Sequence, residues 1–219
     1  MGKSLFVVGM GGHAKSLASL ASDLGFEVAA YISKQSKLKV FENAPVFSDY
    51  SCLRESSDVN IAIALGDNYL RERTYLDLKE YVRETDVKIR FPKLIHPSVS
   101  LGKMAEVEEG SIVFPGANIG AHSFVSSFCI LNHLSSIDHE SVMKQFSSCA
   151  PGVVTGGNVE IGERSAILIG AAVAHRVVVG ADTVLAGNSF LNSDAQDLKL
   201  YGGSPARVLK DRYLGEPYL

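Results

Sequence analysis

Tryptophan is absent from the 219-residue chain, and aromatic residues make up only 8% of it. A core must therefore be built from aliphatic and small side chains, and hydrophobic residues do reach 46%. Charged residues amount to 21%, an ordinary globular balance that excludes a disordered chain. The length leaves room for two compact domains.

Basic residues are also scarce, since 21 Lys and Arg stand against 24 Asp and Glu. Binding to duplex nucleic acid needs a basic surplus that neutralises phosphates, so we expect no nucleic-acid partner. The longest apolar stretches, such as residues 165–175, are too short to cross a bilayer, and we expect no membrane span. The apolar start at residues 4–10 is soon interrupted by Gly, His and Lys, which favours a buried strand over a signal peptide.

Only three cysteines occur, Cys52, Cys129 and Cys149, and they form no CxxC motif. An odd number at wide spacing argues against a disulfide framework or a zinc site and fits a reducing compartment. The six histidines show no HExxH or comparable spacing, so we expect no metal.

Residues 4–91 alternate short apolar runs with amphipathic stretches. Continuous apolar runs are typical of parallel strands buried on both faces. Gly25 marks the end of one helix, and Asp67 or Asn68 could cap the next. The pattern predicts strands over 4–10, 26–32, 59–65 and 87–91, and helices over 14–24 and 70–82. We therefore predict a Rossmann-like α/β domain with a short parallel sheet over residues 1–93.

A period of six begins at residue 95, where fifteen of seventeen positions in one column are aliphatic or Met. The column is Ile95, Leu101, Val107, Val113, Ile119, Val125, Leu131, Ile137, Met143, Cys149, Thr155, Ile161, Ile167, Val173, Val179, Leu185 and Leu191. A second column, four residues further on in each hexad, holds only small or β-branched residues from Val99 to Ser189. This period fits neither a helix nor a long strand, and it predicts a solenoid of short strands and corners.

Glycine often follows the aliphatic position, as at Gly102, Gly120, Gly156, Gly162 and Gly180. We expect these glycines to supply backbone freedom at the bends. The hexad pattern resembles that of the hexapeptide-repeat acyltransferases. The resemblance implies a left-handed parallel β-helix over residues 94–219, ending in a C-terminal tail, with three hexads in each coil.

Five motifs narrow the resemblance, and they occur in order along nearly the whole chain. They are GMGGHAK, ALGDN, LIHPSV, LNHLSSIDHE and YGGSPARVLK. Together they look like those of the bacterial sugar acetyltransferases that N-acetylate nucleotide-linked 4-amino sugars, and of the sialic acid O-acetyltransferases.

The resemblance implies that His139 is the general base and that Glu140 orients its ring and stabilises the cation. An imidazole suits this task because its ordinary pKa lies near working pH. Asn132 matches an asparagine of the same pocket, and His133 beside it only lines the site. The sequence departs from the family at Ser148, where a second histidine often stands. Another departure is Lys144, which replaces an expected glycine.

Coenzyme A in this family lies in a groove between neighbouring β-helices. Matching positions implies donor contacts from Gly157, Ile169 and Gly187. In the terminal segment, Pro205 and Arg207 would lie near the nucleotide end of the donor, where an arginine can meet phosphate. The alternative is that the glycines at these positions only allow the chain to bend and do not contact coenzyme A.

The segment Gly9, Gly11, Ala14 resembles a dinucleotide fingerprint with its third glycine replaced. The second predicted strand ends in YIS without the acid that NAD sites use, so a redox cofactor is not expected. The loop can still hold a diphosphate on backbone N–H groups. The resemblance implies that the nucleotide sugar is bound by Gly11, Gly12, His13, Asp67 and Asn68. The choice of nucleotide stays open, because some relatives have an acid at the position of Ser33.

We therefore expect an acetyl-CoA-dependent N-acetyltransferase that acts on a nucleotide-linked amino sugar of the 4-amino-4,6-dideoxy type. Transfer would be direct, since no GxSxG motif is present. The resemblance implies a cytoplasmic homotrimer that serves bacterial surface glycan synthesis, such as that of lipopolysaccharide. The alternatives are O-acetylation of a sugar such as sialic acid, a non-catalytic β-helix favoured by Lys144 and Ser148, and an NAD-linked oxidoreductase.

Overall fold

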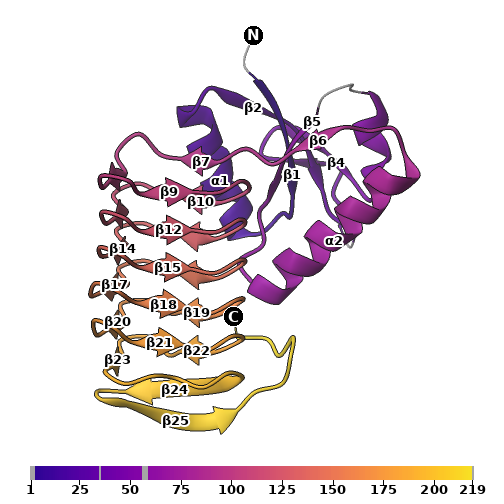
Figure 1. The fold of residues 1–219 in the computed structure, drawn as a ribbon. Helices are drawn as coiled ribbons and strands as arrows, with labels where there is room; N and C mark the ends of the chain where they lie inside the picture. The colour runs from indigo at the N-terminus through magenta and orange to yellow at the C-terminus, as the bar shows by residue number, and fades with distance from the viewer. Residues whose placement is uncertain (1–2, 35, 56–58, 219) are drawn as a thin grey trace. The chain divides into compact units, whose positions relative to one another are not determined.

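The computed structural model describes residues 3–34, 36–55 and 59–218, shown as a ribbon in Figure 1. The chain forms two compact units. One comprises residues 1–66 and 70–94, and the other comprises residues 67–69 and 95–219. Among the described residues, no helix has both the length and the apolar character needed to cross a bilayer.

The first unit is built on a sheet of six strands in the order β3-β4-β2-β1-β5-β6. Its pairs are parallel except for the antiparallel hairpin of β3 and β4. The strands are β1 (Lys3–Val8), β2 (Phe26–Ile32), β3 (Val40–Phe41), β4 (Ala44–Phe47), β5 (Val59–Ile63) and β6 (Ile89–Arg90). The helices are α1 (Gly12–Asp23), the 3-10 helix η1 (Tyr50–Glu55) and α2 (Asn68–Glu84).

This arrangement confirms the predicted α/β fold with its short parallel sheet. The central strand β1 is buried on both faces, with Leu5 and Val7 fully inaccessible. Helix α1 buries Leu17 and Leu20 on one side, as the helical spacing predicts. Gly25 follows α1 with a φ of 74°, a left-handed backbone that glycine adopts without strain.

The second unit is a parallel β-helix with three faces (Figure 1). Each face is a sheet of two-residue strands that recur every eighteen residues, and one face ends in two longer strands, β24 and β25. One face has β7 (Leu94–Ile95), β10 (Ile112–Val113), β13 (Ile130–Leu131), β16 (Ser148–Cys149), β19 (Ala166–Ile167), β22 (Val184–Leu185), β24 (Lys199–Gly203) and β25 (Ala206–Asp211). The second has β8 (Ser100–Leu101), β11 (Asn118–Ile119), β14 (Ser136–Ile137), β17 (Val154–Thr155), β20 (Ala172–Val173) and β23 (Phe190–Leu191). The third has β9 (Glu106–Val107), β12 (Phe124–Val125), β15 (Val142–Met143), β18 (Glu160–Ile161) and β21 (Val178–Val179).

The two columns read from the sequence form the interior of this β-helix. From Val107 to Leu191 the aliphatic column is buried, including Cys149 and Thr155. The first two members of the column differ, because Ile95 is only partly buried and Leu101 is 49% exposed. The small column is buried from Ser111 onward, and its serines donate hydrogen bonds to backbone carbonyls, as Ser111 does to Ser126 and Ser123 does to Asp138. The left-handed parallel β-helix predicted by the resemblance is confirmed.

The five glycines that follow the aliphatic column were predicted to supply backbone freedom at the bends, and this explanation is wrong. None of these glycines has a positive φ. Each instead lies against the next coil, so that a Cβ on Gly162 would stand 2.5 Å from the carbonyl carbon of Gly180. The left-handed residue is the one three positions after the aliphatic column, at every hexad from Met104 to Asn188.

The chain ends in the hairpin of β24 and β25, which the hexad pattern does not predict. Strand β24 continues one face of the β-helix in parallel with β22, and β25 then returns antiparallel to it. In Figure 1 this yellow hairpin covers the last coil. Burial of Tyr201 and Ala206 joins the hairpin to the interior column.

Candidate active site

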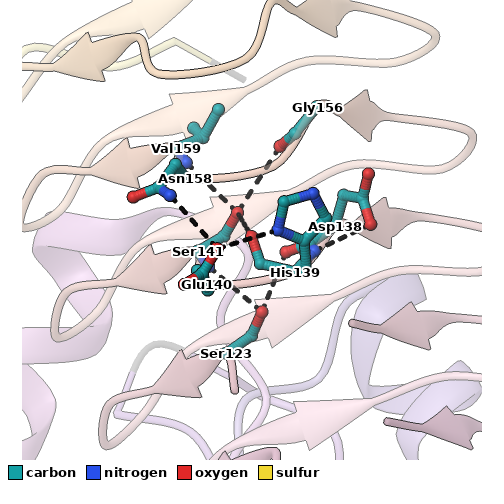
Figure 2. Close-up of polar contacts among 8 residues, drawn as sticks. All are labelled: Ser123, Asp138, His139, Glu140, Ser141, Gly156, Asn158 and Val159. Atoms are coloured by element: carbon teal, nitrogen blue, oxygen red, sulfur yellow. Dashed lines mark hydrogen bonds and ion pairs between the residues drawn. The ribbon is translucent and has the colours of Figure 1, made fainter. Parts of the chain in front are cut away.

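His139 and Glu140 lie side by side at one corner of the β-helix, between β14 and β15 (Figure 2). The Nδ1 atom of His139 is 3.1 Å from Oε2 of Glu140. Both side chains are open to solvent, with exposed fractions of 56% and 58%. A carboxylate can only accept a hydrogen bond, so this contact places the ring proton on Nδ1 and leaves Nε2 as the basic nitrogen.

The backbone of this corner is held by the coils before and after it. The N–H of His139 donates to Oδ1 of Asp138 at 2.7 Å, and the N–H of Glu140 donates to the carbonyl of Ala121 at 2.8 Å. Glu140 has the left-handed φ of 56° found at each corner. Ser123 donates its hydroxyl proton to the carbonyl of Asp138 at 2.8 Å. The corner is therefore fixed before any ligand binds.

Two residues of the following coil, Gly157 and Asn158, contact His139 and Glu140. The side-chain amide of Asn158 donates to Oε2 of Glu140 at 3.3 Å, and its backbone N–H donates to the carbonyl of His139 at 2.8 Å. Gly157 lies directly under the imidazole, and a Cβ at this position would overlap the ring atoms of His139. Asn158 was not predicted as a site residue, because the only indication in the sequence is its position eighteen residues after Glu140.

The other predicted site residues of the β-helix lie at a different corner. Asn132 and His133 follow β13, whereas His139 follows β14. His133 stacks on Phe114, with ring centroids 4.8 Å apart. Ile169 and Gly187 continue the His133 column at intervals of eighteen residues, and a Cβ on Gly187 would lie 3.1 Å from the carbonyl oxygen of Ile169.

Within one chain the structure therefore divides the predicted residues between two corners. His139, Glu140 and Gly157 share the first corner, and Asn132, Ile169 and Gly187 share the second. Ile169 is 59% exposed and offers an apolar contact surface. Pro205 and Arg207 lie in the terminal hairpin, where both are exposed and Nη1 of Arg207 donates to the carbonyl of Ala206.

The two departures from the family pattern have structural partners of their own. Lys144 forms an ion pair with Glu160 at 2.5 Å, on the face that follows the His139 corner. Ser148 stands in β16, paired with Ile130 and Ala166. Within the described part of the chain, no group of three or more His, Cys, Asp or Glu side chains is placed to hold a metal ion.

The first unit has a pocket of about 260 Å³ at the carboxyl ends of β1, β2 and β5. Its lining includes Gly9 after β1, Ser33 and Lys34 after β2, and Asp77 on α2. Strand β1 lies between β2 and β5, so the chain reverses its winding direction at this strand. Ligands of open α/β sheets bind at such a switch point.

The glycine loop lies at the same edge of the sheet. Gly9 has a φ of 117°, and a Cβ there would stand 2.7 Å from the carbonyl oxygen of Ala64, so this position requires glycine. Gly11 caps α1 without a side-chain hydrogen bond, and no atom lies within 4 Å of a Cβ placed on Gly11 or Gly12. The loop is open to an anion at the helix start. His13, in the first turn of α1, is half-buried.

Asn68 is held by hydrogen bonds within the chain. It is fully buried, and its side-chain amide donates to the carbonyls of Arg164 and Ser165 at 3.1 and 3.0 Å. Its backbone N–H donates to the hydroxyl of Tyr218 at 2.9 Å. A contact of Asn68 with a base or ribose would have to replace these bonds. Asp67 precedes it at the start of α2, and the predicted nucleotide contacts of both residues stay predictions.

Comparisons with known proteins find chains of similar sequence and fold. Residues 4–78 match the family model described as the PglD N-terminal domain. The perosamine N-acetyltransferase PerB from Caulobacter crescentus, solved with CoA and GDP-perosamine, is 28% identical with a TM-score of 0.84, covering 94% of this chain and 97% of its own. The acetyltransferase domain of PglB from Neisseria gonorrhoeae, solved with acetyl coenzyme A, is 26% identical with a TM-score of 0.85, covering 95% of this chain and all of its own (100%).

A more distant likeness shows the fold alone. WeeI from Acinetobacter baumannii is 19% identical with a TM-score of 0.81, covering 94% of this chain and 100% of its own. The matches thus extend over both units of the chain. They confirm the resemblance drawn from the sequence motifs: the chain is similar over both units to hexapeptide-repeat N-acetyltransferases of nucleotide-linked amino sugars.

Proposed function

We propose that the chain transfers the acetyl group of acetyl-CoA to the 4-amino group of a nucleotide-linked 4-amino-4,6-dideoxy sugar, with His139 as general base. The observation that carries the proposal is the 3.1 Å contact between Nδ1 of His139 and Glu140, on a corner fixed by neighbouring coils. It leaves Nε2 to accept a proton from the acceptor. Two of the similar structures are variants of the Caulobacter enzyme in which one histidine is replaced, and both hold CoA and GDP-perosamine.

The proposed reaction is a direct transfer. The neutral sugar amine attacks the thioester carbonyl carbon and forms the new N–C bond, and the attacking nitrogen gives up one proton to Nε2 of His139. The C–S bond then breaks, and the thiolate of coenzyme A receives that proton from the imidazolium. Glu140 stabilises the charged ring between the two steps. A base of this kind contributes about 10²–10⁴ in rate.

The cysteines support a transfer without an acyl-enzyme. Cys52, Cys129 and Cys149 are all buried. Burial raises the pKa of the Cys149 thiol far above its ordinary value, and the neighbouring Cys129 adds to the shift. A buried neutral thiol is a poor nucleophile. The rate therefore depends on holding amine and thioester together.

The donor and acceptor are assigned to separate parts of the chain. We propose that residues 94–219 bind acetyl-CoA through Gly157, Ile169, Gly187, Pro205 and Arg207. Residues 1–93 would hold the nucleotide sugar through Gly11, Gly12 and His13, with Asp67 and Asn68 near the base or ribose. The open N-terminus of α1 supports a diphosphate contact.

The division of the site between two corners supports a homotrimer. A groove formed by the His139 corner of one β-helix and the Ile169 corner of another would bring the two residue sets together. Asn132 belongs to the second corner and would then face the catalytic pair of a partner subunit. We propose such a trimer, acting in the cytoplasm in the synthesis of a bacterial surface glycan.

The assay that tests the function measures release of coenzyme A with a thiol reagent. Acetyl-CoA is combined with UDP-, dTDP- and GDP-linked 4-amino sugars and, separately, with free sialic acid. We expect transfer to a nucleotide-linked amine, and a loss of about 10²–10⁴ in kcat for His139→Ala. His122→Asn, at an exposed corner one coil away, serves as the control and keeps activity. Equal activity in His139→Ala, or transfer to sialic acid alone, would contradict the proposal.

A further inference from the structure

The pocket of the first unit contains a charged pair that the proposed function does not yet use. Lys34 comes directly after β2, and Asp77 lies on α2. The Nζ atom of Lys34 is 3.0 Å from Oδ2 of Asp77 and 5.3 Å from the ring centroid of Tyr50. The two charged side chains are 59% and 43% exposed, so a ligand in the pocket can reach both.

The lining of the rest of the pocket has the chemistry of a site for an apolar ring. Val8, Ile32, Leu65 and Leu70 give it apolar walls. Its volume of about 260 Å³ lies just below the range for drug-sized ligands, which suits a fragment such as one nucleobase. Burial, aided by the charge of Asp77, raises the pKa of Tyr50 to about 12, so its hydroxyl stays neutral.

The charges around the pair indicate which end of a nucleotide lies there. A hollow next to the pocket shares Lys34 and Asp77 and adds Glu80 and Glu84. Three carboxylates and one ammonium group repel a diphosphate. The diphosphate is better placed at Gly11 and Gly12, where α1 begins. The base then lies toward Lys34 and Asp77.

The hydrogen-bond donors and acceptors of Lys34 and Asp77 can distinguish one nucleobase from another. Guanine presents two neighbouring N–H donors, N1–H and the N2 amino group, beside its O6 acceptor. The two oxygens of Asp77 can accept from both donors, and the ammonium of Lys34 can donate to O6. Uracil and thymine present one N–H between two carbonyl oxygens, so a carboxylate gains one bond and meets two repelling oxygens.

We infer that Lys34 and Asp77 recognise guanine, and that the preferred acceptor is a GDP-linked amino sugar. This inference rests on the proposed function. The sequence alone leaves the nucleotide open, because the acid that some relatives carry is replaced by Ser33. In the structure the carboxylate of Asp77 on α2 lines the same pocket as Ser33, although it lies 44 residues later in the chain.

The test is calorimetric titration of the full chain with GDP, UDP, dTDP and ADP, without acetyl-CoA. We expect GDP to bind at least about tenfold more tightly than UDP or dTDP, the discrimination of one bidentate contact. Asp77→Asn should weaken GDP binding by about tenfold and leave UDP binding nearly unchanged. Lys34→Met should also weaken GDP binding, because it removes the ammonium group that donates to O6. Asp86→Asn, an exposed carboxylate beyond the end of α2, is the matched control and keeps the preference.

The outcomes separate this inference from the proposed function. Equal binding of all four nucleotides, or a GDP preference that survives Asp77→Asn, overturns the guanine assignment while the acetyltransferase proposal stands. A preference for UDP or dTDP overturns it as well. If no nucleotide binds at any concentration tested, the nucleotide-sugar site itself fails. Because Lys34 and Asp77 are exposed and such surface pairs contribute little to stability, the variants fold.

Discussion

Two residues of the coil after the His139 corner determine how His139 is held. Gly157 leaves the space that the imidazole occupies, and Asn158 holds the carboxylate that orients it. The motif LNHLSSIDHE identifies His139 and Glu140 in the sequence. The sequence does not show that Gly157 and Asn158 position this pair, because each contact joins residues eighteen positions apart.

Gly157→Ala should therefore reduce activity without unfolding the chain. The new Cβ would overlap the His139 ring, which has an exposed side to move into, so the imidazole shifts and the backbone is kept. A displacement of about 1 Å can cost about 10²-fold in rate. The measurements are kcat/KM and Tm, and an unchanged kcat/KM would contradict this positioning.

Asn158 should act through Glu140 and change the pH dependence of the reaction. Asn158→Gly removes the amide but keeps the left-handed backbone, whose φ is 60° here. Asn158→Asp sets a second carboxylate 3.3 Å from Glu140 and repels it from its present position. We expect both variants to lower kcat more than they raise KM, by about tenfold. The acid limb of the pH–rate profile should move to higher pH in Asn158→Asp, because the added negative charge favours the protonated ring. Asn158→Gly adds no charge and should leave the limb near its wild-type position. A wild-type profile in Asn158→Asp would contradict this role of Asn158.

At the level of elements, the hexad rule explains nearly every strand of the β-helix. Each aliphatic position from Ile95 to Leu191 is the second residue of a strand, because one inward side chain per face is enough to fill a narrow interior. The rule stops at the hairpin of β24 and β25, where pairing replaces periodicity. In the first unit β3, β4 and η1 were not predicted, since these segments have only two, four and six residues, too few for a clear periodic pattern.

The glycine that follows the aliphatic residue should be required by packing between coils. Gly162→Ala would place a Cβ 2.5 Å from the carbonyl carbon of Gly180, within backbone that cannot move without separating two coils. We expect a loss of about 1–3 kcal/mol or more in the free energy of unfolding. Gly12→Ala is the control for stability, since no atom lies within 4 Å of its Cβ position. Thermal or denaturant unfolding measures both, and equal stabilities would contradict the close packing.

At the level of the whole molecule, a site divided between two corners predicts a defined assembly. Sedimentation should give a species of three chains, 3 × 23.5 kDa or about 70 kDa. The sequence could supply the residues on both corners but not their separation, since that follows only from the order of the faces around the coil. A monomer with full activity would contradict the proposed trimer.

Complementation between two inactive variants tests the same geometry more directly. His139→Ala damages the first corner, and Ile169→Glu places a charge against the donor at the second, where Ile169 is 59% exposed. If each site takes one corner from each of two chains, random mixed trimers regain intact sites at a frequency of about one half times one half, or one quarter. Co-expressed variants should then show about a quarter of wild-type CoA release, whereas separately purified variants show almost none. If both corners of a site came from one chain, every mixed trimer would stay inactive, because each chain carries one damaged corner.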